Sequence, residues 1–309
     1  MATKIVDLHC DTLSVCLEKD LPLCSEQLHI GFTRRPWQLH LCQAMAIYLT
    51  NDLSAPAARE RFFSAYQVYL RQSAAHCLPT LRDLRCISQC LDAQDVALFL
   101  TVEGGVLLGG DILWVDKLHE MGVKMLTLTM NGPGDICGGV GSQQTFTPFG
   151  RQVVRRMEEL GMAVDVSHMN ETSFWELCEF AERPFCASHS NAQTICAHPR
   201  NLTDAQFREI ARRGGVVGLN YFRDFIAAGG DTRTVDDLLR HLHHFLDLGG
   251  EDTIALGSDF DGCVPAGYID GIDKLPAFIR SIESSGVGSA TVEKILHGNA
   301  TRYLGGIGK

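Results

Sequence analysis

Histidine and carboxylate residues stand at the ends of short apolar segments in this sequence. The apolar run over 4–8 leads into His9 and Asp11, which are two positions apart. Side chains alternate between the two faces of a strand, so His9 and Asp11 are predicted to point one way and Cys10 the other. Two ligand-type residues on one face at the end of a buried strand need a partner, and a divalent metal ion is a suitable one.

The same arrangement recurs at four more predicted strand ends. Glu103 ends one apolar run, His168 and His189 end two others, and Asp259 ends a fourth, with Asp261 two residues beyond. Taken singly, each of these residues is better explained by a structural role, as a core histidine or a capping carboxylate. Five such ends together indicate a metal centre, because the carboxyl ends of the strands of an α/β barrel gather its reactive residues.

The donor types indicate which metal chemistry to expect. Three histidines, one aspartate and one glutamate suit two divalent ions, with zinc the first candidate, and Glu103 is the candidate for a bridging ligand. Two bridged ions about 3.5–4 Å apart can share a hydroxide and polarise a carbonyl or phosphoryl oxygen. Asp259 would exchange the proton, first as base and then as acid for the leaving group. Asp261 is the rival for that role, but it lies farther beyond the strand.

Strand-like and helix-like segments alternate along the chain. The apolar runs predict eight strands, near 5–9, 43–49, 97–103, 124–129, 163–167, 185–188, 216–220 and 253–258. Helical periodicity falls between them, at 57–91, 111–121, 150–160, 172–181, 204–213 and 235–248. This alternation is typical of an α/β protein with a parallel sheet covered by helices, and eight repeats predict a (β/α)8 TIM barrel of the metal-dependent hydrolase type. We expect one catalytic domain over 1–309, with the glycine-rich stretch 132–142 as a flexible active-site loop.

Composition excludes several classes of function. The chain has 309 residues, 45% of them hydrophobic and 21% charged, and a formal net charge of -10, which argues against a general nucleic-acid or anionic-membrane surface. No signal-peptide pattern or apolar run of membrane-spanning length is present, so no membrane association is expected. The twelve cysteines include no C-x-x-C pair and are predicted to be reduced, which favours a cytoplasmic protein.

Several motifs, in this order along nearly the whole chain, resemble those of the renal (membrane) dipeptidase family of zinc peptidases. They are Asp7-Leu8-His9-Cys10-Asp11, Val102-Glu103-Gly104-Gly105, Leu126-Thr127-Leu128-Thr129, Asp165-Val166-Ser167-His168, Ala187-Ser188-His189-Ser190-Asn191-Ala192, His198-Pro199-Arg200-Asn201 and Gly257-Ser258-Asp259-Phe260-Asp261-Gly262. The resemblance implies a metal-dependent dipeptidase on a (β/α)8 barrel that holds two zinc ions.

The resemblance also implies roles for individual residues. One zinc would be bound by His9, Asp11 and Glu103, and the other by Glu103, His168 and His189. Asp259 matches the acid/base carboxylate of the family. Arg200 matches the residue that holds the terminal carboxylate of the substrate, a role that suits the planar guanidinium fork. Without the neighbouring motif, Arg200 would be interpreted as a solvated surface arginine.

One position departs from the family pattern. Where the animal enzymes have a histidine after Leu-Thr-Leu-Thr, this chain has Met130 followed by Asn131. That histidine is thought to help bind the substrate and the developing oxyanion, and methionine cannot donate a hydrogen bond. Asn131, or the second zinc alone, would have to serve in its place.

Other histidines are interpreted structurally. His241, His243 and His244 fall on one predicted helix, and a solvated helix face is the preferred interpretation over a chelating pair. His198 lies beside Arg200 in the sequence, and lining of the pocket and a structural role are equally compatible with it.

The expected function is therefore hydrolysis of the amide bond of small dipeptides, with acceptance of a C-terminal D-residue by analogy with the family. Two alternatives stay open from the sequence: a binuclear metal hydrolase of the same fold that acts on another amide, a lactone or a phosphoester, and a metal-binding homologue without catalysis. The expected partner is a small dipeptide. Because the family often forms homodimers, a homodimer is a candidate assembly, although no stretch of the sequence identifies an interface.

Overall fold

The computed structural model describes residues 3–93 and 95–307. Within the described residues, one parallel sheet holds seven strands in the order β5-β4-β3-β2-β1-β7-β6. The strands are β1 (Thr3–Asp7), β2 (Leu39–Tyr48), β3 (Val96–Glu103), β4 (Val123–Thr127), β5 (Ala163–Asp165), β6 (Val217–Leu219) and β7 (Ile254–Leu256).

The predicted strand at 185–188 is not a regular strand in the structure. It forms single parallel bridges instead, from Cys186 to Asp165 of β5 and from Ala187 to Val217 of β6. The backbone of Cys186 exchanges hydrogen bonds with the chain at Val164 and Val166, and Ala187 bonds to the chain beside β6. This short segment therefore lies between the two edge strands of a strongly curled sheet.

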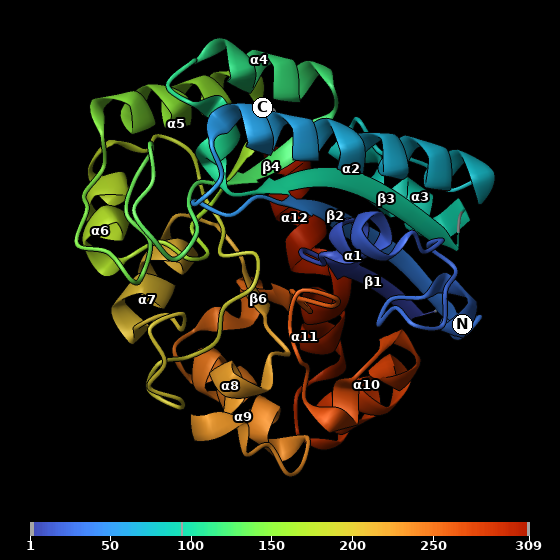
Figure 1. The fold of residues 1–309 in the computed structure, drawn as a ribbon. Helices are drawn as coiled ribbons and strands as arrows, with labels where there is room; N and C mark the ends of the chain where they lie inside the picture. The colour runs from blue at the N-terminus through green and yellow to red at the C-terminus, as the bar shows by residue number, and fades with distance from the viewer. Residues whose placement is uncertain (1–2, 94, 308–309) are drawn as a thin grey trace.

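Helices surround the sheet (Figure 1). They are α1 (Thr12–Lys19), α2 (Ala55–Ala75), α3 (Ile87–Ala93), α4 (Leu113–Glu120), α5 (Pro148–Leu160), α6 (Glu171–Phe180), α7 (Asp204–Arg212), α8 (Arg223–Ile226), α9 (Asp236–Asp247), α10 (Leu275–Ser284), α11 (Ser289–Glu293) and α12 (Asn299–Gly306). All six helical segments predicted from periodicity are present, and the longest contains two helices, α2 and α3. The sequence interpretation missed α1, α8 and the three helices of the C-terminal region.

Local capping signals explain where several helices begin and end. Thr147 accepts a hydrogen bond from the backbone N–H of Gly150 at the start of α5, and Gly161 ends that helix with a φ of 67°. At the start of α7, Thr203 and Gln206 cap each other's backbone groups as a capping box. The bounds predicted from periodicity, 150–160 and 204–213, lie within two residues of those of the two helices.

Two apolar clusters lie on opposite faces of the strands. The larger one fills the space between the sheet and the outer helices. The smaller one gathers the alternate strand residues, among them Val6, Ala97 and Phe99, against Tyr303 and Leu304 of α12. Figure 1 shows α12, in red, near the centre of the molecule. The two-residue periodicity of β3 continues from Phe99 to Glu103, so the inner face that is apolar at one end of the strand becomes acidic at its carboxyl end.

No helix in the described part of the chain combines the length with the apolar character that a bilayer crossing demands.

Candidate metal centre and active site

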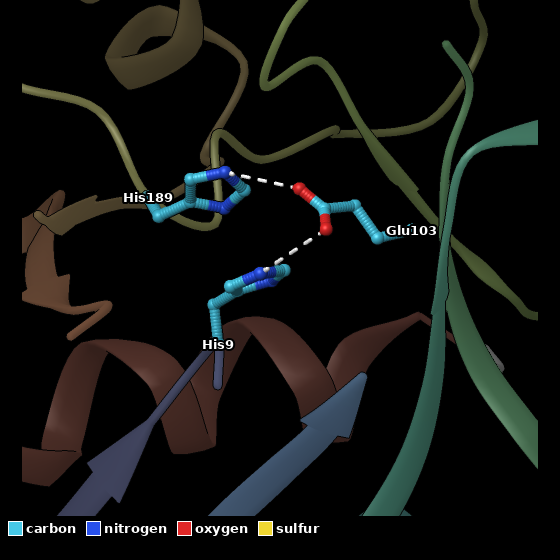
Figure 2. A group of neighbouring side chains, drawn as sticks. All are labelled: His9, Glu103 and His189. Atoms are coloured by element: carbon cyan, nitrogen blue, oxygen red, sulfur yellow. Dashed lines mark ion pairs between the residues drawn. The ribbon is translucent and has the colours of Figure 1, made fainter. Parts of the chain in front are cut away.

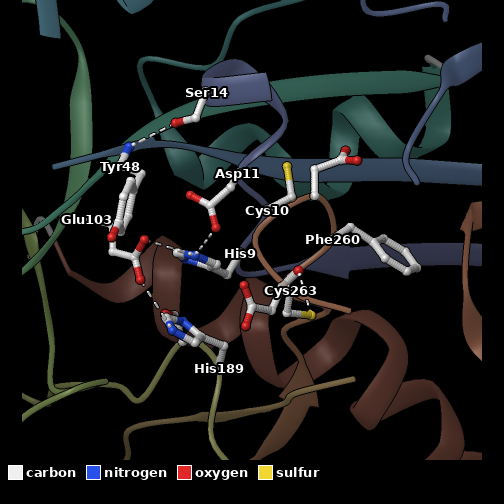
Figure 3. A network of polar contacts seen from close by, with 12 residues as sticks. His9, Cys10, Asp11, Ser14, Tyr48, Glu103, His189, Phe260 and Cys263 are labelled. Atoms are coloured by element: carbon white, nitrogen blue, oxygen red, sulfur yellow. Dashed lines mark hydrogen bonds and ion pairs between the residues drawn. The ribbon is translucent and has the colours of Figure 1, made fainter. Parts of the chain in front are cut away.

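The five side chains predicted to bind metal converge at the carboxyl ends of the strands. All of them are buried, with exposed fractions between 1% and 9%. They follow β1, β3, β5 and the 185–188 segment, and they are His9, Asp11, Glu103, His168 and His189. Cys10 points away from them, as predicted, and its thiol lies 3.3 Å from the backbone oxygen of Ala44 on β2. Figure 3 shows His9 between Asp11 and Glu103, with the sulfur of Cys10 directed elsewhere.

Glu103 lies between the histidines and divides its two oxygens among them. Its Oε2 is 3.7 Å from His9 Nε2, whereas its Oε1 is 2.9 Å from His168 Nε2 and 3.5 Å from His189 Nε2. Figure 2 shows the carboxylate directed at the rings of His9 and His189. On the far side of His9, Asp11 Oδ2 lies 3.4 Å from the same Nε2. A carboxylate with one oxygen toward each group of donors has the shape of a bridging ligand.

The hydrogen bonds of two imidazoles show that this donor set fits a cation. The Nδ1 atoms of His168 and His189 face Asn131 Oδ1 at 2.8 Å and Ser188 Oγ at 2.7 Å. An imidazole that donates from Nδ1 presents a lone pair at Nε2, and these two Nε2 atoms are only 3.2 Å apart. His9 Nε2 and Asp11 Oδ1 are buried and have no hydrogen-bond partner among the described residues. Lone pairs that converge in a buried space suit a divalent ion.

Without a bound metal ion, the charges of the buried side chains around Glu103 are poorly balanced. Burial, with Asp11 beside it, raises the pKa of Glu103 well above its usual range. Burial also opposes a charge on His9, but Glu103 and Asp11 outweigh it and raise the pKa of His9 to about 10. The pKa values of His168 and His189 are held well below the usual range, mainly by burial. Protons therefore take the place that a cation would take, and a bound metal ion would compete with them.

Backbone conformation at the site is unusual in two ways. His168 and Asp259 have positive φ angles of 69° and 58°, a region that costs a non-glycine residue about 1–2 kcal/mol. Gly104, with a φ of 102°, directly follows Glu103, and a Cβ there would overlap the backbone oxygen of Leu49. A Cβ on Gly262 would overlap the carboxylates of Asp11 and Asp259, so any larger residue there would displace one or both of them.

Asp259 is the carboxylate that is free to exchange a proton. It is 8% exposed, and its Oδ2 accepts a hydrogen bond of 3.0 Å from Asn220 Nδ2. Burial, together with the charge of Asp11, raises the pKa of Asp259 to about 6. By contrast, both oxygens of the rival Asp261 are occupied, by Thr12 Oγ1 at 2.6 Å and by the backbone N–H of His29 at 2.8 Å.

A cavity of about 390 Å³ opens onto these groups. Its lining includes Glu103, His168 and Asp259, together with the aromatic residues Tyr48, Phe222 and Phe225. Arg200 also lines it. Its side chain is buried, and Nε and Nη2 have no hydrogen-bond partner among the described residues. Burial lowers the pKa of Arg200 to about 10, which still leaves it cationic at neutral pH. A partnerless buried guanidinium in a cavity is suited to an anionic ligand.

The residues in the place of the family histidine line the same cavity. Met130 contributes apolar surface, and Asn131 directs its amide oxygen at His168 Nδ1. The neighbouring glycine-rich loop is tied to this corner by hydrogen bonds from Val140 N to the oxygen of His168 and from Gly141 N to the oxygen of Asn131. His198 does not line the cavity. Its ring packs on Phe225 with centroids 4.5 Å apart.

The interpretation of the histidine-rich helix was wrong for one residue. His241 is fully buried, and its Nδ1 accepts a hydrogen bond from Ala192 N while its Nε2 lies 2.9 Å from the oxygen of Ile226. Its neighbours His243 and His244 are partly exposed, and His244 pairs with Asp204. The hydrophobic face of α9 turns His241 toward the sheet, and two backbone groups satisfy its ring there.

Sequence reasoning also missed two polar residues near the centre. Asn220 follows β6 and orients Asp259, so the rule that found the other strand ends would have found it. Asp165, the last residue of β5, is fully buried and accepts hydrogen bonds from three neighbouring hydroxyl-bearing residues. It stood inside a quoted motif without an assigned role, because its importance depends on partners far away in the chain.

Comparison with known proteins identifies the family to which this chain is similar. The chain matches the family described as Membrane dipeptidase (Peptidase family M19) over residues 1–308. An uncharacterised protein encoded in the pqqA 5′ region of Klebsiella pneumoniae is 34% identical over 249 residues, which are 76% of this chain and 92% of that protein. An uncharacterised dipeptidase of Schizosaccharomyces pombe is 30% identical over 218 residues, or 67% of this chain, and the match spans about half (52%) of that protein.

Solved structures agree with this chain in fold. A dipeptidase described as a family M19 metallopeptidase superposes with a TM-score of 0.94 at 24% identity and covers 100% of both chains. A metallopeptidase from Rhodobacter sphaeroides, solved with a phosphinate mimic of the dipeptide L-Ala-D-Ala, gives a TM-score of 0.93 at 23% identity over 98% of this chain and 99% of its own. With the family match over nearly every residue, the chain belongs to the membrane dipeptidase family, peptidase family M19.

Proposed function

We propose that this protein is a zinc-dependent dipeptidase that hydrolyses the amide bond of small dipeptides. The observation that carries the proposal is the position of Arg200, which lines the same cavity as the converging metal donors and whose Nε and Nη2 have no hydrogen-bond partner among the described residues. A substrate with a free carboxylate and a scissile amide a short distance away suits both groups at once. The family membership supports the proposal, as does the L-Ala-D-Ala mimic bound to the Rhodobacter sphaeroides relative.

The proposed ligand sets follow the two sides of Glu103. His9, Asp11 and Glu103 would hold one ion, and Glu103, His168 and His189 the other. When bound, such a pair of divalent ions supplies a nucleophile at neutral pH by lowering the pKa of water, and it polarises the substrate carbonyl.

Asp259 is proposed to hold and move the proton. Its carboxylate borders the cavity beside Asp11, where it can take a proton from the attacking water and give it to the nitrogen of the leaving amine. The hydrogen bond from Asn220 fixes Oδ2, which leaves Oδ1 free for the transfer. A pKa raised toward neutrality by burial suits a group that must be base and acid in turn.

Arg200 is proposed to bind the terminal carboxylate of the substrate. A guanidinium and a carboxylate form two parallel charge-assisted hydrogen bonds, and the resulting pair fixes the direction in which the scissile amide points. The Arg200 guanidinium lies 5.4 Å from the ring of Phe225, on which Phe222 packs, so apolar surface borders that part of the cavity. Asn131 was predicted to contact the substrate, and its place on the cavity wall keeps this proposal open for its amide nitrogen.

Several finer features belong to the same proposal. We propose that residues 1–309 form one catalytic (β/α)8 barrel in which the 185–188 segment serves as the eighth strand between β5 and β6. Acceptance of a C-terminal D-residue is proposed from the likeness to the Rhodobacter sphaeroides structure. Zinc as the native metal, a cytoplasmic location and a homodimer stay predictions from the sequence.

The test compares L-Ala-D-Ala and L-Ala-L-Ala with their C-terminal amides, on zinc-loaded protein before and after chelation. Loss of two charge-assisted hydrogen bonds costs about 3 kcal/mol or more, so the free acids should be cleaved at least about 100-fold better than the amides. The variant Arg200→Met should lose this preference chiefly through KM. The matched control Arg240→Met removes an exposed arginine that pairs with Asp237, and it should behave as wild type.

Two outcomes would contradict the proposal. Equal turnover of acids and amides by the wild-type protein would show that no substrate carboxylate is bound. Zinc-loaded protein that cleaves no dipeptide would exclude the dipeptidase, leaving a hydrolase of other amides, lactones or phosphoesters, or a protein without catalysis.

A further inference from the structure

The two imidazoles on one side of Glu103 are held in different ways through the nitrogen that faces away from it. His168 Nδ1 meets a neutral amide oxygen, that of Asn131, at 2.8 Å. His189 Nδ1 meets the hydroxyl oxygen of Ser188 at 2.7 Å, and this hydroxyl is itself hydrogen-bonded to the carboxylate of Asp165 at 2.6 Å. A buried acid is therefore connected to one of the two rings and not to the other.

Asp165 is an unusual acid for a protein interior. Its side chain is fully buried, and it forms no salt bridge with any residue between 3–93 and 95–307. Its Oδ1 accepts from the backbone N–H groups of Ser167 and Ser188 and from Ser167 Oγ, at 2.8–3.0 Å. Its Oδ2 accepts from Thr127 Oγ1 and Ser188 Oγ, both at 2.6 Å. All five of these contacts are hydrogen bonds that the Asp165 carboxylate accepts.

The position of each proton in the hydrogen bonds from Asp165 through Ser188 to His189 can be assigned atom by atom. A serine hydroxyl has one proton, and an ionised carboxylate can only accept, so Ser188 Oγ–H points at Asp165 Oδ2. The lone pairs of Ser188 Oγ are then left for His189, whose Nδ1 must carry the proton of that 2.7 Å contact. With Nδ1 protonated, the neutral ring of His189 has its lone pair at Nε2, which faces Glu103 Oε1 at 3.5 Å.

We propose that Asp165, acting through Ser188, is a positioning residue that fixes the tautomer of His189 and strengthens its Nε2 as a metal ligand. Asn131 fixes His168 in the same tautomer without a charge. The inference rests on the proposed metal centre and extends it, because it assigns work to two residues that touch neither metal nor substrate. Groups that hydrogen-bond a metal-ligating imidazole orient it and raise its basicity, and their loss typically weakens metal affinity about 10- to 100-fold.

The fold explains how three strand ends can meet in this chain. Thr127 ends β4, Asp165 ends β5, and Ser188 belongs to the segment that is bridged to β5 at Cys186. Their side chains form a polar layer between the apolar inner cluster and the metal donors. The position of His189 is therefore coupled to the closure of the sheet, since Ser188 can reach Asp165 only while the segment stays beside β5.

The decisive comparison uses two serines that both donate to Asp165. Ser188→Ala removes the hydroxyl that contacts the imidazole of His189. Ser167→Ala removes a hydroxyl that contacts Asp165, Ser188 and the backbone N–H of His189, but not its ring. Zinc affinity is measured by competition with a chromophoric chelator, and the cobalt-substituted proteins are compared by visible absorption. Ser188→Ala should weaken one zinc site about 10- to 100-fold and change the cobalt spectrum, whereas Ser167→Ala should stay close to wild type in both.

Further variants test the charge and guard against misfolding. Asp165→Asn should weaken the same site as Ser188→Ala, and Asn131→Ala should weaken zinc binding less, since its amide is uncharged. The melting temperature of each chelated variant identifies any that fails to fold. If Asp165→Asn does not fold, the comparison of Ser188→Ala with Ser167→Ala still tests the inference. Equal zinc affinities and cobalt spectra for Ser188→Ala and Ser167→Ala would overturn the inference.

Failure of the dipeptidase proposal would be distinguishable from failure of this one. Wild-type protein that binds zinc but cleaves no dipeptide would remove the substrate assignment, and the serine comparison would still test the relay. Wild-type protein that binds no divalent metal would overturn both.

Discussion

Acidification should destabilise this protein through His241 on α9, whose ring is enclosed far from solvent. The neutral imidazole uses both nitrogens: Nδ1 accepts from Ala192 N at 3.0 Å, and Nε2 donates to the oxygen of Ile226 at 2.9 Å. Ala192 follows the strand end of His189, and Ile226 belongs to α8 at the cavity wall. Protonation of Nδ1 would remove the acceptor and place a buried charge between these two loops.

The size of the effect follows from the shift of the pKa. Burial lowers the pKa of His241 from 6.5 to about 4. Between these values the unfolded chain binds the proton and the folded chain does not, so stability falls as the pH is lowered through 6.5 toward 4. At pH 5 the loss attributable to this ring is about 2 kcal/mol, and it approaches about 3 kcal/mol below pH 4. Above pH 6.5 the ring is neutral in both states and contributes no dependence.

Substitution of His241 by glutamine isolates the contribution of its imidazole to the pH dependence of stability. Glutamine offers an acceptor and a donor but cannot be protonated, so His241→Gln should remove the pH dependence while keeping polar partners for both loops. Free energies of unfolding in urea are measured for the chelated proteins at pH 7.5 and pH 5. The wild type should lose about 2 kcal/mol more than the variant between the two pH values. His243→Gln, at a partly exposed position of the same helix, is the control and should follow the wild type.

The comparison between proteins matters because other buried groups also titrate in this range. Their contribution is common to wild type and variant and cancels in the difference. Equal losses of stability in wild type and His241→Gln would refute the reasoning, and would mean that His241 is not held neutral by its surroundings.

Three other predictions concern the candidate site. Asn220→Ala removes the hydrogen bond that favours the ionised form of Asp259. The acidic limb of the pH profile of kcat should therefore move to higher pH, and kcat should fall about fivefold. An unchanged pH profile would argue against Asp259 as the titrating group. Gly262→Ala should weaken zinc binding at the site proposed for His9, Asp11 and Glu103, because the added Cβ crowds the Asp11 carboxylate. Gly267→Ala, where a Cβ meets open space, should bind zinc as the wild type does, and an unchanged zinc affinity of Gly262→Ala would contradict the described geometry. Chelation should lower the melting temperature reversibly, because free metal at 100 times its Kd stabilises the folded chain by about 2.7 kcal/mol per site. A melting temperature that changes neither with chelator nor with added zinc would mean that no ion is bound.

Much of the site was predictable from the sequence, since its signals are local. His9, Glu103 and Asp259 each follow an apolar run directly, and such residues at the carboxyl ends of parallel strands meet at one edge of the sheet. The outward direction of Cys10 likewise follows from the two-residue period of a strand. The helices between the strands were predicted for the same reason, because helical periodicity is a pattern of near neighbours in the chain.

The regularity of the 185–188 segment was decided by the tertiary structure. Its four residues are as apolar as a strand, yet they form only two single bridges, to Asp165 and to Val217. Whether a short apolar segment makes a regular ladder depends on how the two edge strands beside it diverge, and nothing in the segment records this. The same holds for His241, whose burial depends on which side of α9 the sheet approaches.

The hydrogen-bond partners of the site residues were also decided only by the tertiary structure. The sequence by itself determined which residue types reach the carboxyl end of the sheet: three histidines, Asp11, Glu103 and Asp259. The tertiary structure decided that Asp261 is already bonded to Thr12, 249 positions away, and so leaves Asp259 free. It also joined Asp165 to Ser188. Strand and helix patterns are set by neighbours in the chain, whereas a hydrogen bond across a sheet exists only after closure has brought its two ends together.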